Sequence, residues 1–289
     1  MEAAVRRFAC TQCGKCCNRS PEVELSEAAA LADVFVFRLM FRLHRWPSAL
    51  RDWVGDGTPT SSGEVFFQTK RMLGAHAARK SKTKVVNGTK AVEYDEYLFI
   101  SALSLDANSG ACSALHDGRC SIYERRPFTC RTVPLQYWRV DAALPRQFDA
   151  FVGTPGYACD TSESAPAVLD GGRIVDDELQ RSRTDALAMS EQDSSWRQAI
   201  LRRLKSGKDG LPTLREIDAS ASFAAVTVSM RLAWEIGAEV GLLSAEECRT
   251  IAGMQTKLID RELSSERWSG DARQTLLEMQ DEYRRAPNS

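Results

Sequence analysis

The chain has 289 residues, 43% of them hydrophobic, which is enough to bury a core in one large or two modest domains. Its 38 basic and 39 acidic residues give a net charge of −1, which argues against a nucleic-acid-binding protein with a strongly basic surface. The opening MEAAVRRFAC lacks the apolar core of a signal peptide, and no run approaches the ~18 consecutive apolar residues of a membrane span. We therefore expect a soluble, cytoplasmic protein without membrane contact.

The first feature along the chain is the stretch CTQCGKCC, which begins at Cys10 and holds four cysteines. Because the cytosol keeps thiols reduced, clustered cysteines there more often bind metal or carry out redox chemistry than form disulfides. Cys10, Cys13 and Cys16 stand in the CxxCxxC register of bacterial ferredoxins, and Gly14 suits the tight turn between them. Adjacent side chains tend to diverge, so we expect one of Cys16 and Cys17 to face a second metal, another cluster edge or a redox partner.

The segment between the two cysteine groups contains an expected helix, a loop, a basic stretch and a strand. Ser26 is the candidate N-cap of a mostly apolar helix from Glu27 to about Arg45, and WVGDGTPTSSGEV has the composition of a loop. Residues 65–92 carry seven Lys or Arg and no acid, which is typical of a solvated surface segment; contact with an anionic partner is the alternative. The aromatic and β-branched residues of EYLFISALSLD predict a strand.

The second cysteine group is CSALHDGRCSIYERRPFTCR, which begins at Cys112. Its Asp-Gly pair predicts a turn that folds Cys112 back beside Cys120. Pro127 breaks the chain direction and can open a new turn that presents Cys130. A dense thiolate group needs nearby positive charge and hydrogen-bond donors, and these can come from Tyr123, Arg125, Arg126 and Arg131.

Two further residues near this group are weighed as metal ligands. His116 is interpreted as a loop histidine, with metal binding as the alternative. Cys159 follows the turn in PGYACD and has no partner at a fixed spacing, so it stands equally as a ligand or a free thiol.

Beyond a polar joint near residues 160–172 the pattern becomes helical. The apolar residues between Trp196 and Leu204 share one face, and Gly207 is a candidate C-cap. A capping box at Thr213 and Glu216 predicts a long helix that continues through Trp234.

A second capping box, at Ser244 and Glu247, predicts the next helix. Cys248 stands at helical spacing with Ile251 and Leu258, so we interpret it as a core thiol. The last hundred or so residues are expected to form a small helical bundle.

CTQCGKCC followed by GRCSIYERRPFTCRTVP resembles the YkgJ-type cysteine-cluster family, a zinc- or iron-chelating domain. The shared elements are CxxCxxCC and then G-x-C-x-I-Y-x-x-R-P-x-x-C-R-x-x-P, which ends at Pro134. The resemblance spans about residues 8–160. The wider family is linked to flagellin lysine N-methylation, although the N-terminal spacing here departs from those methylases. The resemblance implies metal chelation.

We predict an α+β protein with an irregular, metal-organised cysteine-cluster domain over residues 1–160 and a mainly helical region over residues 161–289. No dinucleotide fingerprint, P-loop or nucleophile elbow accompanies the cysteines, and no catalytic residue can be named. We favour an iron–sulfur cluster of the 4Fe–4S type, with Tyr123, Arg126 and Arg131 around it. The expected ligands are Cys10, Cys13, Cys16, Cys17, Cys112, Cys120, Cys130 and Cys159.

Two questions about function stay open at this point. The alternative to an iron–sulfur cluster is a zinc-stabilised structural or interaction module without catalysis. If the chain is an enzyme, it carries out a redox or protein-modifying reaction and works with a protein partner or electron donor.

Overall fold

The structure is a computed structural model that describes residues 5–47, 53–54, 58–59, 76–83, 92–107, 110–207, 211–220 and 225–285. Its strands are β1 (Arg6–Arg7), β2 (Glu22–Val23), β3 (Phe37–Pro47), β4 (Trp53–Val54), β5 (Thr58–Pro59), β6 (His76–Thr83), β7 (Val92–Ser104), β8 (Leu115–His116), β9 (Arg119–Cys120), β10 (Ala167–Asp170), β11 (Arg173–Ile174) and β12 (Ala225–Ser229).

The α-helices are α1 (Leu25–Ala30), α3 (Phe128–Arg131), α4 (Leu144–Val152), α5 (Asp177–Gln192), α6 (Ser194–Ser206), α7 (Leu214–Ala219), α8 (Arg231–Glu239), α9 (Ala245–Leu263) and α10 (Gly270–Arg284). The described residues also include short 3₁₀ turns: η1 (Lys15–Cys17), η3 (Tyr123–Arg125) and η4 (Asp141–Ala143). The fold is α+β as predicted, with the cysteines concentrated before residue 160 and helices dominating after it.

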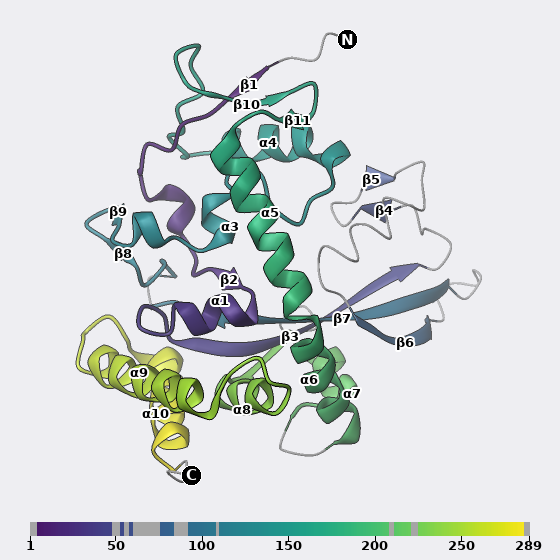
Figure 1. The fold of residues 1–289 in the computed structure, drawn as a ribbon, viewed down its shortest axis with the longest axis vertical. Coiled ribbons are helices and arrows are strands. Elements are labelled where there is room, and N and C mark those ends of the chain that lie inside the picture. The colour runs from purple at the N-terminus through teal and green to yellow at the C-terminus, as the bar shows by residue number, and fades with distance from the viewer. Residues whose placement is uncertain are drawn as a thin grey trace.

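The central layer is an antiparallel sheet of five strands in which β3 and β7 lie side by side (Figure 1). β12 extends this sheet beside β3, whereas β2 and β6 pair with successive parts of the other edge of β7. Phe37, Leu39 and Phe41 are fully buried, so every second side chain of β3 points into the core. The strand predicted over EYLFISALSLD is confirmed as the second half of β7.

The helix predicted from Glu27 to about Arg45 is wrong. α1 ends at Ala30, and after a short turn β3 begins at Phe37. Within FRLMFRL both arginines, Arg38 and Arg42, fall on the positions between Phe37, Leu39, Phe41 and Leu43, a period of two that favours a strand despite the high apolar content. Ser26 is not the N-cap either, because Glu24 occupies that position and the backbone N–H and hydroxyl of Ser26 donate to Asp193.

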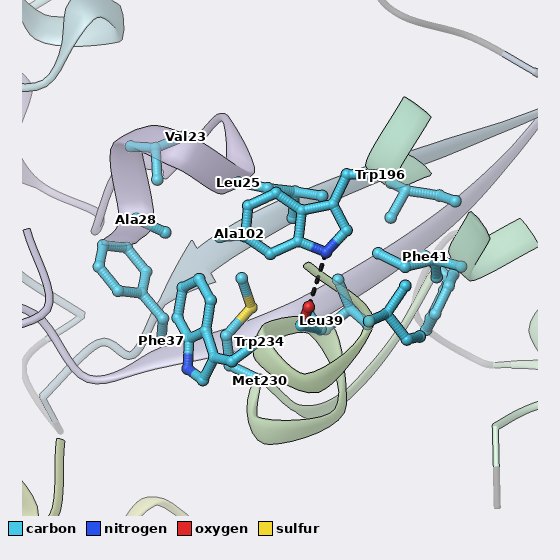
Figure 2. Packing of buried hydrophobic residues seen from close by; sticks show 14 of the residues in the cluster. Val23, Leu25, Ala28, Phe37, Leu39, Phe41, Ala102, Trp196, Met230 and Trp234 are labelled. Carbon is cyan, nitrogen blue, oxygen red and sulfur yellow. Dashed lines mark hydrogen bonds between the residues drawn. The ribbon is translucent and has the colours of Figure 1, made fainter. Parts of the chain in front are cut away.

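Helices α1, α6 and α8 cover one face of the central sheet and share a hydrophobic core with it. Figure 2 shows Trp196 of α6 and Trp234 of α8 packed in this core, with ring centroids 5.8 Å apart. The indole Nε1–H of Trp196 donates to the carbonyl of Ala233 at 2.6 Å, which satisfies the polar atom of a fully buried side chain (Figure 2).

The long helix predicted from Thr213 through Trp234 is also wrong. Its capping box is confirmed at Thr213 and Glu216, but α7 ends at Ala219 and β12 pairs with β3 before α8 begins. The sequence of β12, AVTVS, is rich in β-branched residues, whose branched side chains favour a strand over a helix. The capping box at Ser244 and Glu247 and the left-handed C-cap at Gly207 are confirmed.

Two smaller cores flank the central sheet at opposite ends of the long axis (Figure 1). α9 and α10 pack together around Ile259 and Leu276 at one end. At the other end, α4 and α5 pack on the three-stranded sheet β1–β10–β11 around Leu144 and Leu169. Because β1 pairs with β10 and β3 pairs with β12, strands from both sides of residue 160 share sheets. The domain boundary at that residue stays a prediction.

Parts of two other predictions lie outside the described residues. Within WVGDGTPTSSGEV the structure describes β4 and β5, which pair with each other. Within the basic stretch 65–92 it describes the backbone of β6 and the start of β7. In the part of the chain that is described, no helix is both long and apolar enough to cross a membrane.

A buried ion pair joins the start of α1 to α6. The Nη1 of Arg197 lies 2.6 Å from Oε2 of Glu24, and both residues are buried. The hydroxyl of Tyr137 donates to the other carboxylate oxygen of Glu24 at 2.9 Å. Burial raises the pKa of Glu24, and the positive charge of Arg197 opposes that rise. The carboxylate of Glu24 therefore depends on Arg197 to stay ionised.

We expect Arg197→Met to lower the free energy of unfolding by about 3–5 kcal/mol, because it leaves the carboxylate of Glu24 buried and unpaired. The matched control on the same helix is Arg203→Met, which removes a more exposed ion pair with Glu239 and should cost less than about 1 kcal/mol. Urea denaturation of both variants measures the difference. Equal losses would show that the pair with Glu24 has no special role.

Candidate metal centre

Eight of the nine cysteines line a single cavity of about 780 Å³, and all nine are free thiols. Its lining includes residues of η1, the β8–β9 hairpin and α3. In Figure 1 the hairpin and α3 lie between the β1–β10–β11 sheet and the central sheet. The cysteines that line it are those expected as ligands: Cys10, Cys13, Cys16, Cys17, Cys112, Cys120, Cys130 and Cys159. Cys248 is not among them; it packs at the edge of the central core and its thiol donates to the carbonyl of Trp234.

The N-terminal cysteines are placed by an extended segment followed by one tight turn. Ala9 and Asp160 exchange two backbone hydrogen bonds of 2.8 and 3.1 Å, so Cys10 and Cys159 come to stand opposite each other. Thr11 adds a hydrogen bond from its hydroxyl to the carbonyl of Ala158 at 2.7 Å. This segment aligns the first cysteine of the chain with the last one of the cavity.

Gly14 makes the turn that presents Cys16 and Cys17. Its φ of +69° lies in the left-handed region, as expected for the tight turn, and its carbonyl accepts the N–H of Cys17 at 3.1 Å. A Cβ at this position would lie 2.5 Å from the carbonyl oxygen of Gly118 and 2.9 Å from Cδ1 of Leu115. Only glycine therefore allows the turn to pack against the β8–β9 hairpin.

The second cysteine group starts with the predicted hairpin, which is confirmed. Asp117 and Gly118 form its turn with φ values of +48° and +76°, as a two-residue hairpin turn requires. The backbone N–H of Cys112 donates to the carbonyl of Cys17 at 2.9 Å, and Leu115 of β8 lies opposite Cys120 of β9. The hairpin thus ties the second group directly to the N-terminal motif.

Cys130 is presented by α3, the short helix that opens after Pro127 as predicted. A distant carboxylate satisfies the start of this helix: Oε1 of Glu27 accepts the N–H of Phe128 at 2.6 Å. Burial raises the pKa of Cys130 to about 12 and that of Glu27 to about 7. A bound cation would offset the cost of ionising the buried thiol, since metals bind cysteine as the thiolate.

Cys16 and Cys17 both line the cavity, and the expectation that one of them faces a second metal, another cluster edge or a redox partner stays a prediction. The thiol of Cys17 donates a hydrogen bond to Cys16, and this bond, with a smaller contribution from the charge of Arg126, lowers the pKa of Cys16 to about 6. The same bond, together with burial, raises the pKa of Cys17. The two adjacent thiols therefore influence each other's ionisation inside the cavity.

Tyr123 and Arg126 line the cavity together. The guanidinium carbon of Arg126 lies 3.6 Å from the ring centroid of Tyr123, and its Nε–H donates to the carbonyl of Tyr123 at 2.7 Å. The hydroxyl of Tyr123 hydrogen-bonds the side chain of Cys10. These two residues bring a positive charge and a hydrogen-bond donor to the sulfurs.

The other charged or polar candidates lie outside the cavity lining. The exposed Arg125 pairs with Asp33 at 3.1 Å. Arg131 donates through Nε to the carbonyl of Arg126, and its guanidinium lies 5.3 Å from the ring centroid of Phe128. His116 is exposed on β8.

Several lining residues were missed by sequence reasoning. Tyr157 and Phe151 pack edge to face with ring centroids 5.2 Å apart, and Trp138 and Gln147 add further parts of the wall. Tyr157 stands two residues before Cys159, which was its only signal in the sequence. The remaining residues reach the cavity from α4 and the loop before it, which no cysteine motif marks.

The donor set is chemically suited to a thiophilic metal group. Among the residues that the structure describes, no three His, Cys, Asp or Glu side chains lie close enough together to hold a single metal ion. Cysteine thiolates bind both zinc and the iron atoms of iron–sulfur clusters. The eight thiols that line the cavity therefore fit a zinc or an iron–sulfur group.

We expect Gly14→Ala to remove at least half of the bound metal, because its Cβ would collide with Gly118 and separate the N-terminal motif from the hairpin. The matched control is Gly118→Ala, whose φ is also positive but whose Cβ would meet nothing within 4 Å. Gly118→Ala should lower the free energy of unfolding only by the cost of alanine in the left-handed region, about 1–2 kcal/mol, and should keep its metal. Metal analysis of both purified variants tests this, and equal metal content would refute the packing argument.

The comparisons with known proteins identify one family. Its pattern matches residues 9–160, just over half of the chain, and it is described as "CxxCxxCC: Putative zinc- or iron-chelating domain". Neither a curated protein nor a solved structure matches the chain. The matched span contains all eight cysteines of the cavity and confirms the resemblance found from the two motifs. The chain therefore belongs to the CxxCxxCC family of metal-chelating domains.

Proposed function

We propose that the protein holds an iron–sulfur cluster, with 4Fe–4S as the favoured type, in the cavity lined by its eight cysteines. The observation that carries this proposal is the meeting of eight free thiols from distant segments in one cavity of about 780 Å³. The family description covers both zinc and iron, so the choice of iron rests on the donors themselves. Eight thiols exceed the four that one tetrahedral zinc ion takes.

Hydrogen bonds to the sulfurs support the same choice. The backbone N–H groups of Lys15 and Ala158 lower the pKa of Cys13, although burial opposes them. The backbone N–H of Ala114 acts in the same direction on Cys112, where burial dominates and raises the pKa. Such donors tune the reduction potential of an iron–sulfur cluster.

In this proposal the cluster exchanges electrons with a protein partner in the cytoplasm. Gln12 and Lys15 are exposed beside the N-terminal cysteines, so the edge of the cavity lies near the protein surface. A surface-near cluster suits electron transfer to or from another protein. A zinc-stabilised interaction module is the competing function, and the nature of the bound metal separates the two.

We expect anaerobically purified protein to be brown and to contain iron and acid-labile sulfide. Cys13→Ser should lose most of this iron, because a serine oxygen replaces a soft thiolate poorly. Cys248→Ser is the control that should keep it, since Cys248 lies outside the cavity. Iron and sulfide assays on both variants measure the difference. Colourless wild-type protein with stoichiometric zinc would refute the cluster proposal.

We also expect Arg126→Gln to lower the reduction potential, because the positive charge of Arg126 beside the sulfurs favours the reduced, more negative cluster. Arg125→Gln is the matched control, since that arginine is exposed and paired with Asp33. Potentiometric titration of variants with intact clusters measures the shift. The same potential in both variants would mean that Arg126 only supports the fold.

A further inference from the structure

We propose that the eight cysteines form two separate four-cysteine sites, which meet at the peptide bond between Cys16 and Cys17. This inference rests on the proposed function, since it assigns the ligands of the metal-binding cavity. The first site consists of Cys10, Cys13, Cys16 and Cys159, and the second of Cys17, Cys112, Cys120 and Cys130.

The first site is held together by backbone pairing at one end of the cavity. The bridge between Ala9 and Asp160 places Cys10 opposite Cys159. The N–H of Ala158, next to Cys159, is directed at the sulfur of Cys13. Cys10 and Cys159 both pack against the core that surrounds Leu144 and Leu169.

The second site is held together by the hairpin and α3 at the other end. The N–H of Cys112 donates to the carbonyl of Cys17 at 2.9 Å, and the hairpin turn brings Cys120 back toward Cys112. Cys112 belongs to the core beneath the central sheet, and Cys17 packs against that same core. Two cysteines of each site therefore pack against a different hydrophobic core.

The CxxCxxC register assigns Cys16 to the first site. Cys10, Cys13 and Cys16 are three consecutive ligands at ferredoxin spacing, and Cys159 supplies a fourth from far along the chain. In two-cluster ferredoxins, the cysteine that follows three such ligands binds the other cluster. Cys17 occupies the corresponding role here, although it follows Cys16 directly. Each site then has the four thiolates that one 4Fe–4S cluster takes.

The test compares the wild-type chain with two double variants, Cys10→Ser/Cys159→Ser and Cys120→Ser/Cys130→Ser. Two sites predict about eight irons and eight sulfides per wild-type chain and about half of each in either variant. Electron paramagnetic resonance of the reduced wild type should show two interacting clusters. Each variant should show the simpler signal of one isolated cluster.

A single site would give about four irons in the wild type and the loss of all iron in both variants, which would overturn the division. If either variant fails to fold, the iron count and the spectrum of the wild type decide alone. Absence of iron and sulfide would refute the proposed cluster instead. The number of zinc ions bound per chain would then still test the division into two sites. Two zinc ions per chain would support two sites, and one zinc ion per chain would refute them.

Discussion

The site depends on one constraint, which is that its thiols come together in a partly buried cavity. Burial raises the free-energy cost of ionising them, and a bound cation would offset that cost. Burial raises the pKa of both Cys112 and Cys130, so neither forms a thiolate readily on its own. The N-terminal segment adds little apolar surface there besides Phe8. Metal–thiolate bonds would add to the backbone pairing of β1 with β10 and of Ala9 with Asp160 in attaching this segment, because metal binding and folding are coupled in cysteine sites.

The central sheet makes that meeting geometrically possible. β2 follows the N-terminal motif directly, and β7 leads into the second cysteine group, so the pairing of these two strands brings the groups to the same end of the sheet. Glu24 then joins the start of α1 to α6 through Arg197. The cavity is thus supported by helices from the C-terminal half, which contribute no cysteine to it.

Local features were predicted well from the sequence because they depend on neighbouring residues. The turn at Asp117 and Gly118, the strand in β7 and both capping boxes follow from short patterns of this kind. All eight cysteines expected as ligands line one cavity, and their role as ligands stays a prediction.

Features that depend on distant residues were not predictable in this way. β3 and β12 were interpreted as helical because apolar residues dominate both segments; their alternation and β-branched residues favour a strand only weakly, and pairing with distant strands, β7 for β3 and β3 for β12, decides the outcome. The interaction between Cys16 and Cys17 and the hydrogen bond from Tyr123 to Cys10 likewise depend on how the chain folds back. No spacing in the sequence carries that information.

The place of β12 has a consequence for synthesis of the chain on the ribosome. Residues 38–42 of β3 find their outer partner only in residues 225–229, so this strand edge stays open until most of the protein has emerged. An open edge rich in apolar residues can pair with other nascent chains. All eight cysteines of the cavity are synthesised before β12. Chains that stall before residue 225 keep the open edge of β3 and would be the form most prone to aggregate.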